Sequence, residues 1–482
     1  MKRVVIVGGG LSGLAAARGV LDEAGRRGPP PQLSLLEREP HLGGKIRSTR
    51  DEGFLCEHGP NGFLDNKPST LALVRRLGAQ ARLLKSNDKA RKRFVFTGGA
   101  LKQLPEDPVS FLLSDLLSIR GKLRLAAEFL LPQGDPREDE TVAAFVRRRL
   151  GDEALEKLID PMSAGIYAGD PSVMSLRSCF PKVAQIEAQF GGLLKGMLAM
   201  QKMAKAMGVQ GPQGAGPGGV LWSLEEGAGE LVETLARSLP EGALRAGAEA
   251  QALEGRPGGG WRVRADGDWM EADAVVLATP AYDAARLLRE HDPVLAERLY
   301  AIPYVPAAVV CTGFHRKDVA HPLDGFGFLV PSAEGRRILG SLWSSSIFAG
   351  RAPEGQVLLT QIVGGARNPE LVNLGDAELL QVVREELGWT LGIRAEPCFT
   401  KVVRWTRAIP QYVVGHAARL QEIESRVGGL GGLFLGGNAY YGIGINDCTA
   451  HGAALGLRVV DWLADPSEGS GTAAAVGGGG SG

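Results

Sequence analysis

Short apolar runs alternate with glycine-rich turns at the start of the chain. Residues 2–7 form a β-branched run that predicts a buried parallel strand, and a turn with four glycines follows at residues 8–13. Three consecutive alanines then favour a helix over residues 14–23, and residues 32–36 form a second apolar run. This order of strand, turn, helix and strand predicts an α/β domain built on a parallel sheet.

The pattern becomes helical between about residues 108 and 207. Leucine recurs through residues 111–131, and leucine and methionine mix with lysine through residues 191–207. Both segments, together with residues 141–150 and 153–159, predict helices that carry an apolar face. Residues 211–219 are rich in glycine and proline and predict a mobile loop.

Short strands return after residue 222 and predict a second, larger sheet. A further apolar run at residues 432–435 leads through a glycine-rich loop into a helix expected at residues 447–463. Residues 465–482 are rich in glycine, serine and alanine and predict a disordered tail. The strands expected in between are residues 261–263, 270–277, 305–314, 325–330, 338–343 and 357–363.

Composition narrows the classes of function. The 482 residues contain 54 Lys and Arg against 54 Asp and Glu, so the chain has no net charge to attract nucleic acid. The five cysteines show neither CxxC nor zinc spacing, which predicts a reducing compartment and no metal site. Because no apolar stretch reaches about 18 residues, we expect no transmembrane helix, and a helix lying on a membrane surface stays open.

The first turn carries the pattern Gly8-x-Gly10-x-x-Gly13 between a strand and a helix, which is the fingerprint of dinucleotide binding. Gly8 permits the tight turn, Gly10 lets the backbone approach a pyrophosphate, and Gly13 lets helix and strand pack closely. Glu37 ends the second strand, where a carboxylate accepts hydrogen bonds from ribose hydroxyls and repels a 2′-phosphate. The sequence therefore predicts a bound dinucleotide other than NADP and leaves FAD and NAD open at this point.

Further glycine motifs favour FAD. A second glycine pair at residues 43–44 follows Glu37, and residues 436–447 form a glycine-rich motif before the last predicted helix. A sheet domain built from both ends of the chain, with two helix N-termini aimed inward, suits a long ligand. With these motifs the chain resembles the FAD-dependent amine oxidase superfamily.

A more specific resemblance rests on several blocks that follow one another through most of the chain. They are residues 57–63, 92–95, 165–171, 325–331, 364–367, 405–412 and 437–448. As a set, these blocks resemble the oxygen-dependent protoporphyrinogen oxidase family, which includes the closely related coproporphyrinogen III oxidases.

The resemblance implies an α/β fold with three domains and a disordered tail at residues 465–482. A Rossmann-like FAD-binding domain is joined by a mixed-sheet substrate-binding domain and an inserted α-helical membrane-binding domain. In that order, the domains comprise residues 1–86 with 221–280 and 430–464, residues 87–107 with 281–429, and residues 108–220.

The resemblance also implies the residues that contact the ligands. Arg93 would pair with a propionate of the substrate, since its guanidinium can donate two hydrogen bonds to one carboxylate. Gly165 would present its carbonyl to the substrate, while Leu329, Leu342 and Ile362 would flank the tetrapyrrole rings. The pattern alone is equally compatible with a solvated charge at Arg93. It is also compatible with an ordinary sheet core that contains Leu329, Leu342 and Ile362. The residues implied for FAD are Gly8, Gly10, Leu11, Ser12, Gly13, Glu37, Arg38, Gly43, Gly44, Lys45, Gly59, Pro60, Asn61, Gly62, Ala250, Thr279, Trp405, Gly437, Asn438, Gly444 and Ile445.

The implied reaction is the six-electron oxidation of protoporphyrinogen IX to protoporphyrin IX by O2, which yields H2O2, in haem biosynthesis. The sequence shows no Ser/His/Asp or Cys/His cluster, as expected where a flavin performs the chemistry. Coproporphyrinogen III is an alternative substrate. An FAD amine oxidase with Tyr440 and Tyr441 as an aromatic cage, a desaturase, and a non-catalytic binder without FAD are alternative functions.

The resemblance finally implies the surroundings of the protein. It predicts a cytoplasmic enzyme that is either free or peripheral on the inner face of the cell membrane. Both a monomer and a homodimer stay open. Diphenyl-ether-type inhibitors are expected in the substrate pocket.

Overall fold

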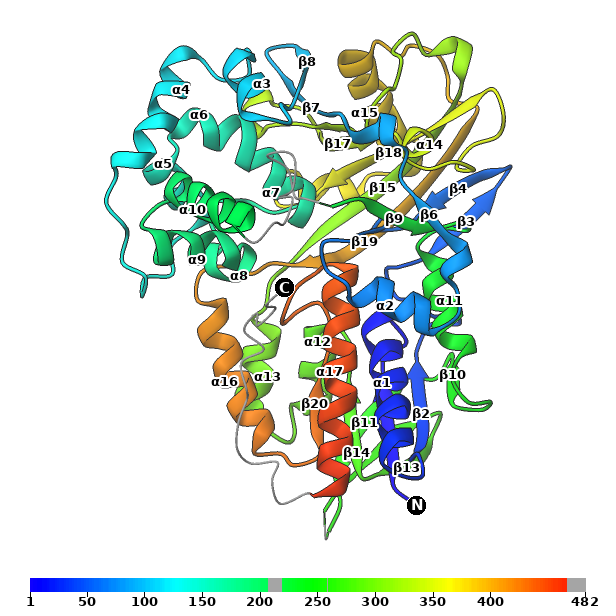
Figure 1. Cartoon of the computed structure of the whole chain (residues 1–482). Coiled ribbons are helices and arrows are strands. Elements are labelled where there is room, and N and C mark those ends of the chain that lie inside the picture. Colours follow the sequence, from blue (N-terminus) through cyan, green and yellow to red (C-terminus); the bar gives the residue numbers. More distant parts are fainter. Residues whose placement is uncertain (207–218, 258, 466–482) are drawn as a thin grey trace.

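The computed structural model describes residues 1–206, 219–257 and 259–465, so nearly all of the predicted loop at 211–219 and of the predicted tail lies outside it. Figure 1 shows two layers of organisation, with an α/β domain below and a large sheet above that is flanked by a group of helices. The predicted mixed α/β class is confirmed by this arrangement.

Five parallel strands form the sheet of the lower domain in the order β10-β2-β1-β14-β20. The central strand consists of the β-branched run that the sequence analysis singled out, and its apolar side chains are buried on both faces. The strands are β1 (Arg3–Val7), β2 (Gln32–Glu37), β10 (Leu244–Ala246), β14 (Ala274–Leu277) and β20 (Leu433–Leu435).

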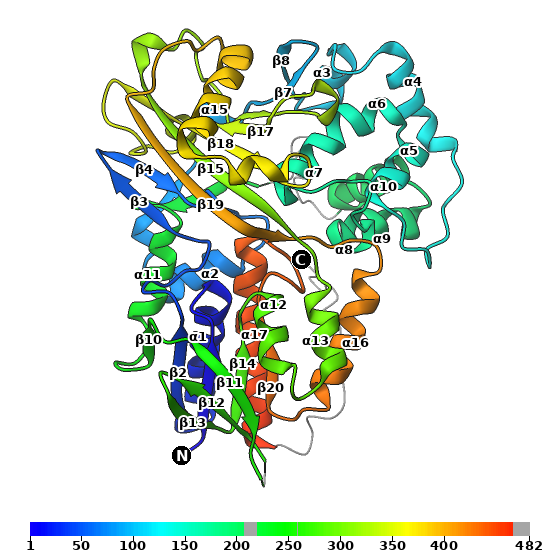
Figure 2. The same ribbon diagram turned by 180° about the vertical axis from the view of Figure 1, so that it is seen from behind.

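Helices cover both faces of this sheet. On one face, α1 (Leu11–Arg27) and α17 (Ile445–Ala464) lie side by side, and a Cβ on Gly456 would be only 2.4 Å from the carbonyl carbon of Gly19. The first and last helices of the described chain therefore pack backbone against backbone. That face also carries α2 (Ser69–Arg76) and α11 (Gly229–Arg237). The other face, nearer in Figure 2, carries α12 (Ala281–Leu288), α13 (Pro293–Tyr300), α16 (His416–Gly428) and the sheet of β11 (Ala250–Gly255), β12 (Trp261–Ala265) and β13 (Asp268–Ala272).

The strand predicted at residues 270–277 is wrong as a single element. It is divided between β13 and β14, which belong to different sheets. The break falls at Asp273, whose N–H donates to the Arg3 carbonyl at 2.8 Å and whose carboxylate accepts from the Arg3 N–H at 2.7 Å. The acidic residues Glu271 and Asp273 within this segment give no signal for a change of sheet, since polar residues also alternate along a single strand.

The upper sheet has seven strands in the order β19-β15-β18-β17-β16-β7-β8. α15 (Asp376–Leu391) covers one face and buries Phe328 and Val363 there. Short strands β3 (Ser48–Asp51), β4 (Phe54–Glu57), β5 (Phe63–Leu64), β6 (Leu83–Lys85) and β9 (Leu221–Leu224) form two smaller sheets. The strands of the upper sheet are β7 (Arg93–Thr97), β8 (Ala100–Gln103), β15 (Tyr304–His315), β16 (Gly327–Leu329), β17 (Ile338–Leu342), β18 (Gln356–Gly364) and β19 (Phe399–Pro410).

The helical group contains α10 (Leu193–Ala206), as predicted, but no single helix over residues 111–131. α3 (Pro108–Leu113) ends early and α4 (Ile119–Ala126) begins after Ser118, whose hydroxyl accepts from the Gly121 N–H at 3.0 Å and donates to Glu153 at 2.7 Å. The leucine pattern of residues 111–131 shows no interruption, but Ser118 caps the N-terminus of a new helix and so divides the segment. The other helices of the group are α5 (Val142–Arg149), α6 (Asp152–Ala154), α7 (Asp160–Tyr167), α8 (Leu176–Cys179) and α9 (Pro181–Phe190).

One buried ion pair ties this helical group together. Glu128 and Arg149 have fully buried side chains and are in direct contact. The Glu128 carboxylate also accepts from the backbone N–H groups of Leu193 and Leu194, at 2.8 and 3.1 Å. The pair therefore holds the start of α10 against the rest of the group.

Candidate active site

Each of the three positions of the fingerprint requires a glycine for a different structural reason. Gly8 has a φ of 108°, and a Cβ there would lie 2.6 Å from the Ala278 carbonyl oxygen. A Cβ on Gly13 would lie 1.9 Å from the Gly8 oxygen, so both positions are closed to any side chain by the protein itself. Around Gly10 the nearest atom to such a Cβ is the Gly43 oxygen at 4.0 Å. Gly10 thus borders open space at the start of α1, where unpaired N–H groups favour a phosphate.

Glu37 stands at the carboxyl end of β2, beside this open space. Its two carboxylate oxygens accept from the backbone N–H groups of Gly9 and Glu39, at 2.8 and 2.9 Å. These bonds fix the orientation of the carboxylate, and each oxygen keeps a second lone pair for a ribose hydroxyl. The neighbouring Arg38 is exposed and pairs with Asp283 at 3.3 Å, so its side chain is engaged elsewhere.

The segment after β2 returns to the fingerprint turn. Gly43 donates its N–H to the Gly9 carbonyl at 2.9 Å and forms an isolated bridge with Gly10. Lys45 is half-buried, with its ammonium 5.5 Å from the centre of the Tyr304 ring, and burial lowers its pKa to about 8. A weakly hydrated cation beside the phosphate space suits an anionic ligand.

Two later glycines allow other segments to approach this region. A Cβ on Gly59 would lie 2.5 Å from the Lys45 carbonyl oxygen, and one on Gly62 would lie 2.2 Å from the Trp222 carbonyl oxygen. Pro60, between them, is exposed. Trp405 of β19 donates its indole N–H to the His58 carbonyl at 2.7 Å and so ties the upper sheet to this segment.

The C-terminal motif supplies a second helix N-terminus at the same edge of the sheet. α17 begins at Ile445 after Gly444, directly beyond the loop that follows β20. Tyr412 fixes that loop, because its hydroxyl donates to the Asn438 carbonyl at 2.7 Å and accepts from the Gly442 N–H at 2.8 Å. Tyr412 belongs to the block of residues 405–412, but no local pattern predicts that it fixes this loop, because Asn438 and Gly442 lie far away along the chain.

Two unpaired polar atoms test whether these residues suit a cofactor. The Asn61 amide nitrogen and the Thr279 hydroxyl are buried and have no hydrogen-bond partner within the described residues. Buried polar groups are normally paired, so both are accounted for by a polar ligand in the same space. Together with the open cradle at Gly10, they fit a bound dinucleotide. Ala250, by contrast, begins β11 and packs its side chain into the apolar core on the other face of the sheet.

Strand register brings the predicted substrate residues onto one face of the upper sheet. Gly327 pairs with residues of β7 and β17, and Gly340 pairs with residues of β16 and β18. Directly paired residues point to the same face, as do residues two apart on one strand. This face lies opposite the one that α15 covers. The four predicted residues that share it are Arg93, Leu329, Leu342 and Ile362.

α7 lies over this apolar face. A Cβ on Gly165 would be 2.7 Å from Leu329 Cδ2, so the helix touches the sheet at that point. Gly165 and the neighbouring Ile166 are nevertheless exposed, and Ile166 keeps 45% of its surface accessible. The structure therefore brings together all five residues that were predicted for the substrate.

Arg93 differs from the other cations of its run. Arg91 pairs with Asp88 at 3.0 Å, and Lys92 pairs with Asp324. The Arg93 guanidinium is half-buried, lies 5.6 Å from the centre of the Phe326 ring and has no hydrogen bond or ion pair within the described residues. Burial lowers the pKa of Arg93, and the charge of Glu106 opposes this shift only in part.

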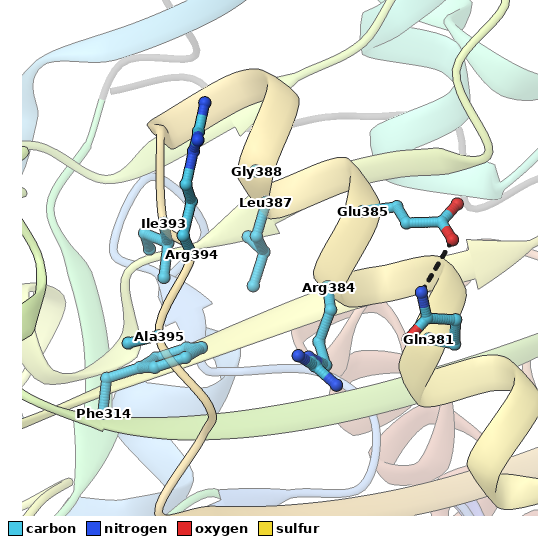
Figure 3. A pocket seen from close by; sticks show the side chains of 9 residues that line it. All are labelled: Phe314, Gln381, Arg384, Glu385, Leu387, Gly388, Ile393, Arg394 and Ala395. Carbon is cyan, nitrogen blue, oxygen red and sulfur yellow. Dashed lines mark hydrogen bonds between the residues drawn. The ribbon is translucent and has the colours of Figure 1, made fainter.

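Two other features fall outside this site. A hollow of about 230 Å³ lies between the end of β15 and α15, and its lining includes none of the predicted site residues (Figure 3). Tyr440 is buried against α16, while Tyr441 stacks on His451, with ring centres 4.8 Å apart. The two rings are 6.4 Å apart and tilted by 46°, and each packs on a further partner, which disfavours the aromatic cage of an amine oxidase.

Comparison with known proteins decides the family. The flavin containing amine oxidoreductase family matches residues 11–454 of this chain. The chain belongs to this family. It is 33% identical over 472 residues to the coproporphyrinogen III oxidase of Bacillus subtilis, covering 96% of this chain and 98% of that protein. The mitochondrial protoporphyrinogen oxidase of Nicotiana tabacum is 29% identical, with 97% of both chains covered. A solved structure from Exiguobacterium sp. 255-15 is 30% identical, covers 95% of this chain and 98% of that one, and has a TM-score of 0.81.

Membership in the flavin containing amine oxidoreductase family confirms the predicted resemblance and the FAD cofactor. FAD supplies the electron-accepting ring of this flavoenzyme. The residues of this chain that would hold it are Gly10 at the open start of α1, Glu37 as an acceptor for ribose hydroxyls, and Ile445 at the second helix N-terminus. The non-catalytic alternative without FAD is disfavoured by the match to a flavin containing family and by the buried, unpaired atoms of Asn61 and Thr279.

Proposed function

We propose that this flavoenzyme oxidises protoporphyrinogen IX to protoporphyrin IX with O2 as the electron acceptor. The observation that carries the proposal is Arg93, a half-buried guanidinium with no hydrogen bond or ion pair among the described residues, at one end of an apolar face. An apolar macrocycle with a carboxylate at its edge fits this arrangement. The ring would lie along Leu329, Leu342 and Ile362 while a propionate pairs with Arg93.

The chemistry balances without a catalytic side chain. Removal of six electrons and six protons from the porphyrinogen corresponds to three hydride transfers with loss of three further protons, and three O2 become three H2O2. The protein has to orient the macrocycle and exclude water, which an apolar sheet face under a helix does. The enzyme would act in haem-type tetrapyrrole biosynthesis.

Coproporphyrinogen III is the second candidate substrate, because the Bacillus subtilis relative carries the name of that oxidase. The two porphyrinogens differ in the number of carboxylates, because protoporphyrinogen IX has two propionates and coproporphyrinogen III has four. Within the run of residues 89–93, Arg93 is the half-buried cation that has no carboxylate partner, while Lys89 is exposed. A single unpaired cation in this run matches the smaller number of carboxylates, and it therefore favours protoporphyrinogen IX as the substrate.

Turnover of the two porphyrinogens tests this function directly. We expect protoporphyrinogen to give the larger kcat/KM, measured by the fluorescence of the porphyrin product. Arg93→Ala should reduce the affinity by about 10- to 100-fold, since a charged hydrogen bond contributes about 1.5–3 kcal/mol, and should leave bound FAD unchanged. Arg91→Ala, which removes a paired exposed cation of the same run, is the matched control. Equal kinetics for the two variants would contradict the assignment of Arg93.

We also propose that the helical group binds the inner face of the cell membrane peripherally. Among the described residues, no helix is long and apolar enough to cross a bilayer. Several large apolar side chains of the group are exposed, with Leu113 at 82% and Leu130 at 83%. Lys122 lies on α4 with the exposed Leu123, and Lys195 lies on α10 with the exposed Met197, as expected for a surface that inserts among anionic headgroups. Diphenyl-ether-type inhibitors would occupy the apolar face next to Leu342 and Ile362.

A further inference from the structure

α7 is the element that closes the proposed substrate site from above. It contacts the sheet through Gly165 and Leu329, yet its exposed side at Ile166 shows that the space around this contact is open. The position of α7 therefore sets how much room a tetrapyrrole macrocycle has over the sheet. The helix is preceded by a π-helical turn at Leu155–Ile159, and Pro161 at its start has no N–H to continue the hydrogen-bond ladder.

The start of α7 is held by a buried ion pair. The Asp160 carboxylate accepts from the Arg367 guanidinium at 2.8 Å and, at the same oxygen, from the Ser332 backbone N–H at 2.7 Å. Arg367 donates a further hydrogen bond to the Val330 carbonyl at 2.6 Å. The side chains of Arg367 and Asp160 are only 13% and 10% exposed, so this pair is screened little by solvent.

The ion pair connects the segments that carry the proposed substrate contacts. Val330 directly follows Leu329 on the chain, and Arg367 lies five residues after Ile362. Asp160 lies five residues before Gly165. Breaking the pair would release the start of α7 from the end of β18 and leave the Ser332 N–H as its remaining hydrogen bond to the segment after β16.

The end of α7 is held by backbone contacts instead. The Ala168 carbonyl accepts from the Ala366 N–H at 2.8 Å, and the Tyr167 carbonyl accepts from the Gln411 side chain at 2.8 Å. Ala168 has a φ of 48°, a left-handed conformation that an alanine adopts only when its surroundings impose it. The start of α7 thus depends on a side-chain ion pair. The end of α7 depends on hydrogen bonds that its backbone carbonyls accept from the Ala366 N–H and the Gln411 side chain.

We propose that Asp160 and Arg367 are positioning residues that set the spacing between α7 and the substrate-binding face of the sheet. They act through Gly165 and do not touch the substrate themselves. This inference rests on the proposed function for its substrate, but the structural part of it concerns the two side chains alone. A tetrapyrrole macrocycle is the ligand class for which this spacing matters, because the ring has to fit between α7 and the sheet.

The test compares Arg367→Met and Arg367→Lys holoenzymes with wild type. Methionine removes all the hydrogen bonds of the guanidinium at similar length, while lysine keeps the charge for Asp160 and loses the second donor to Val330. Arg337→Lys is the matched control, because Arg337 pairs with Glu385 and Glu386 behind the sheet. Four quantities are measured: FAD content from flavin absorbance, kcat and KM for protoporphyrinogen IX, and hydrogen exchange in residues 160–168.

We expect Arg367→Met to raise KM about tenfold or more with a smaller change in kcat, to leave FAD content unchanged and to increase exchange in residues 160–168. Arg367→Lys should give an intermediate KM, and Arg337→Lys should match wild type. The inference would be overturned if Arg367→Met had the same KM as wild type and the same hydrogen exchange in residues 160–168. If wild type oxidises neither porphyrinogen, the proposed function fails, and the exchange data alone then decide whether the pair positions α7.

Discussion

Acidification should destabilise the protein through His416, a buried histidine beside the second cofactor motif. His416 begins α16, is 1% exposed and stacks on Tyr412, with ring centres 4.2 Å apart and an angle of 14° between the planes. Tyr412 in turn holds the loop at Asn438 and Gly442. Burial, with a smaller contribution from Arg419, lowers the pKa of His416 to about 4.

The sign and the size of the effect follow from this pKa. In the unfolded chain a histidine titrates at about 6.5, so between about pH 6.5 and 4 the unfolded state binds a proton that the folded state refuses. The stability that is present above pH 6.5 is therefore lost as the pH falls. At about pH 5, the unfolded state gains about 2 kcal/mol from this one group.

His416→Phe isolates this contribution, because a phenylalanine ring keeps the stack on Tyr412 and cannot take up a proton. Urea unfolding, followed by tryptophan fluorescence at about pH 7.5 and pH 5, gives the loss of stability for each variant. We expect the variant to lose about 2 kcal/mol less than wild type over this range, with less release of flavin into solution at the lower pH. His315→Phe, at an exposed histidine, should lose as much as wild type. An equal acid sensitivity in His416→Phe and wild type would refute the reasoning.

Three further outcomes are expected. Gly10→Val should fold but elute without flavin colour, because its side chain enters the open cradle, whereas Gly13→Val should reduce the soluble yield as well, because its Cβ would meet the Gly8 oxygen at 1.9 Å. Glu128→Gln should lower the free energy of unfolding in urea titrations by less than the loss of about 3–5 kcal/mol expected for a wholly unpaired buried charge, since Arg149 keeps its second partner Glu187 at 3.4 Å. A Leu113→Ser and Leu130→Ser double variant should float less with liposomes of anionic lipid than wild type while keeping its flavin; equal flotation would argue against the membrane surface.

Local motifs were the predictable part of the cofactor site. The turn from Gly8 to Gly13 follows from a strand, a glycine pattern and a helix that are adjacent along the chain, and so does the start of α17 near Ile445. Such short-range features depend on turn geometry and helix propensity, which the sequence carries directly.

The substrate side could be placed only by the resemblance, because pairing between distant strands decides it. Arg93 is one of four cations within five residues, and only its register opposite Gly327 puts it on the apolar face. The contact between Asp160 and Arg367 joins residues 207 positions apart and has no local signal. The division of residues 270–277 between two sheets escaped for the same reason, since the partner at Arg3 lies at the other end of the chain.

The backbone contact between α1 and α17 has a consequence for how the protein is made. Gly19 leaves the ribosome more than 400 residues before Gly456, which must lie against it. At about 5–20 residues per second, the nascent dinucleotide-binding half waits roughly 20 to 90 seconds for its last helix. During that time, the face of α1 that α17 will cover is open to chaperones or to the wrong neighbour. FAD cannot find its complete site before synthesis is nearly finished, so cofactor loading is a late step of biogenesis.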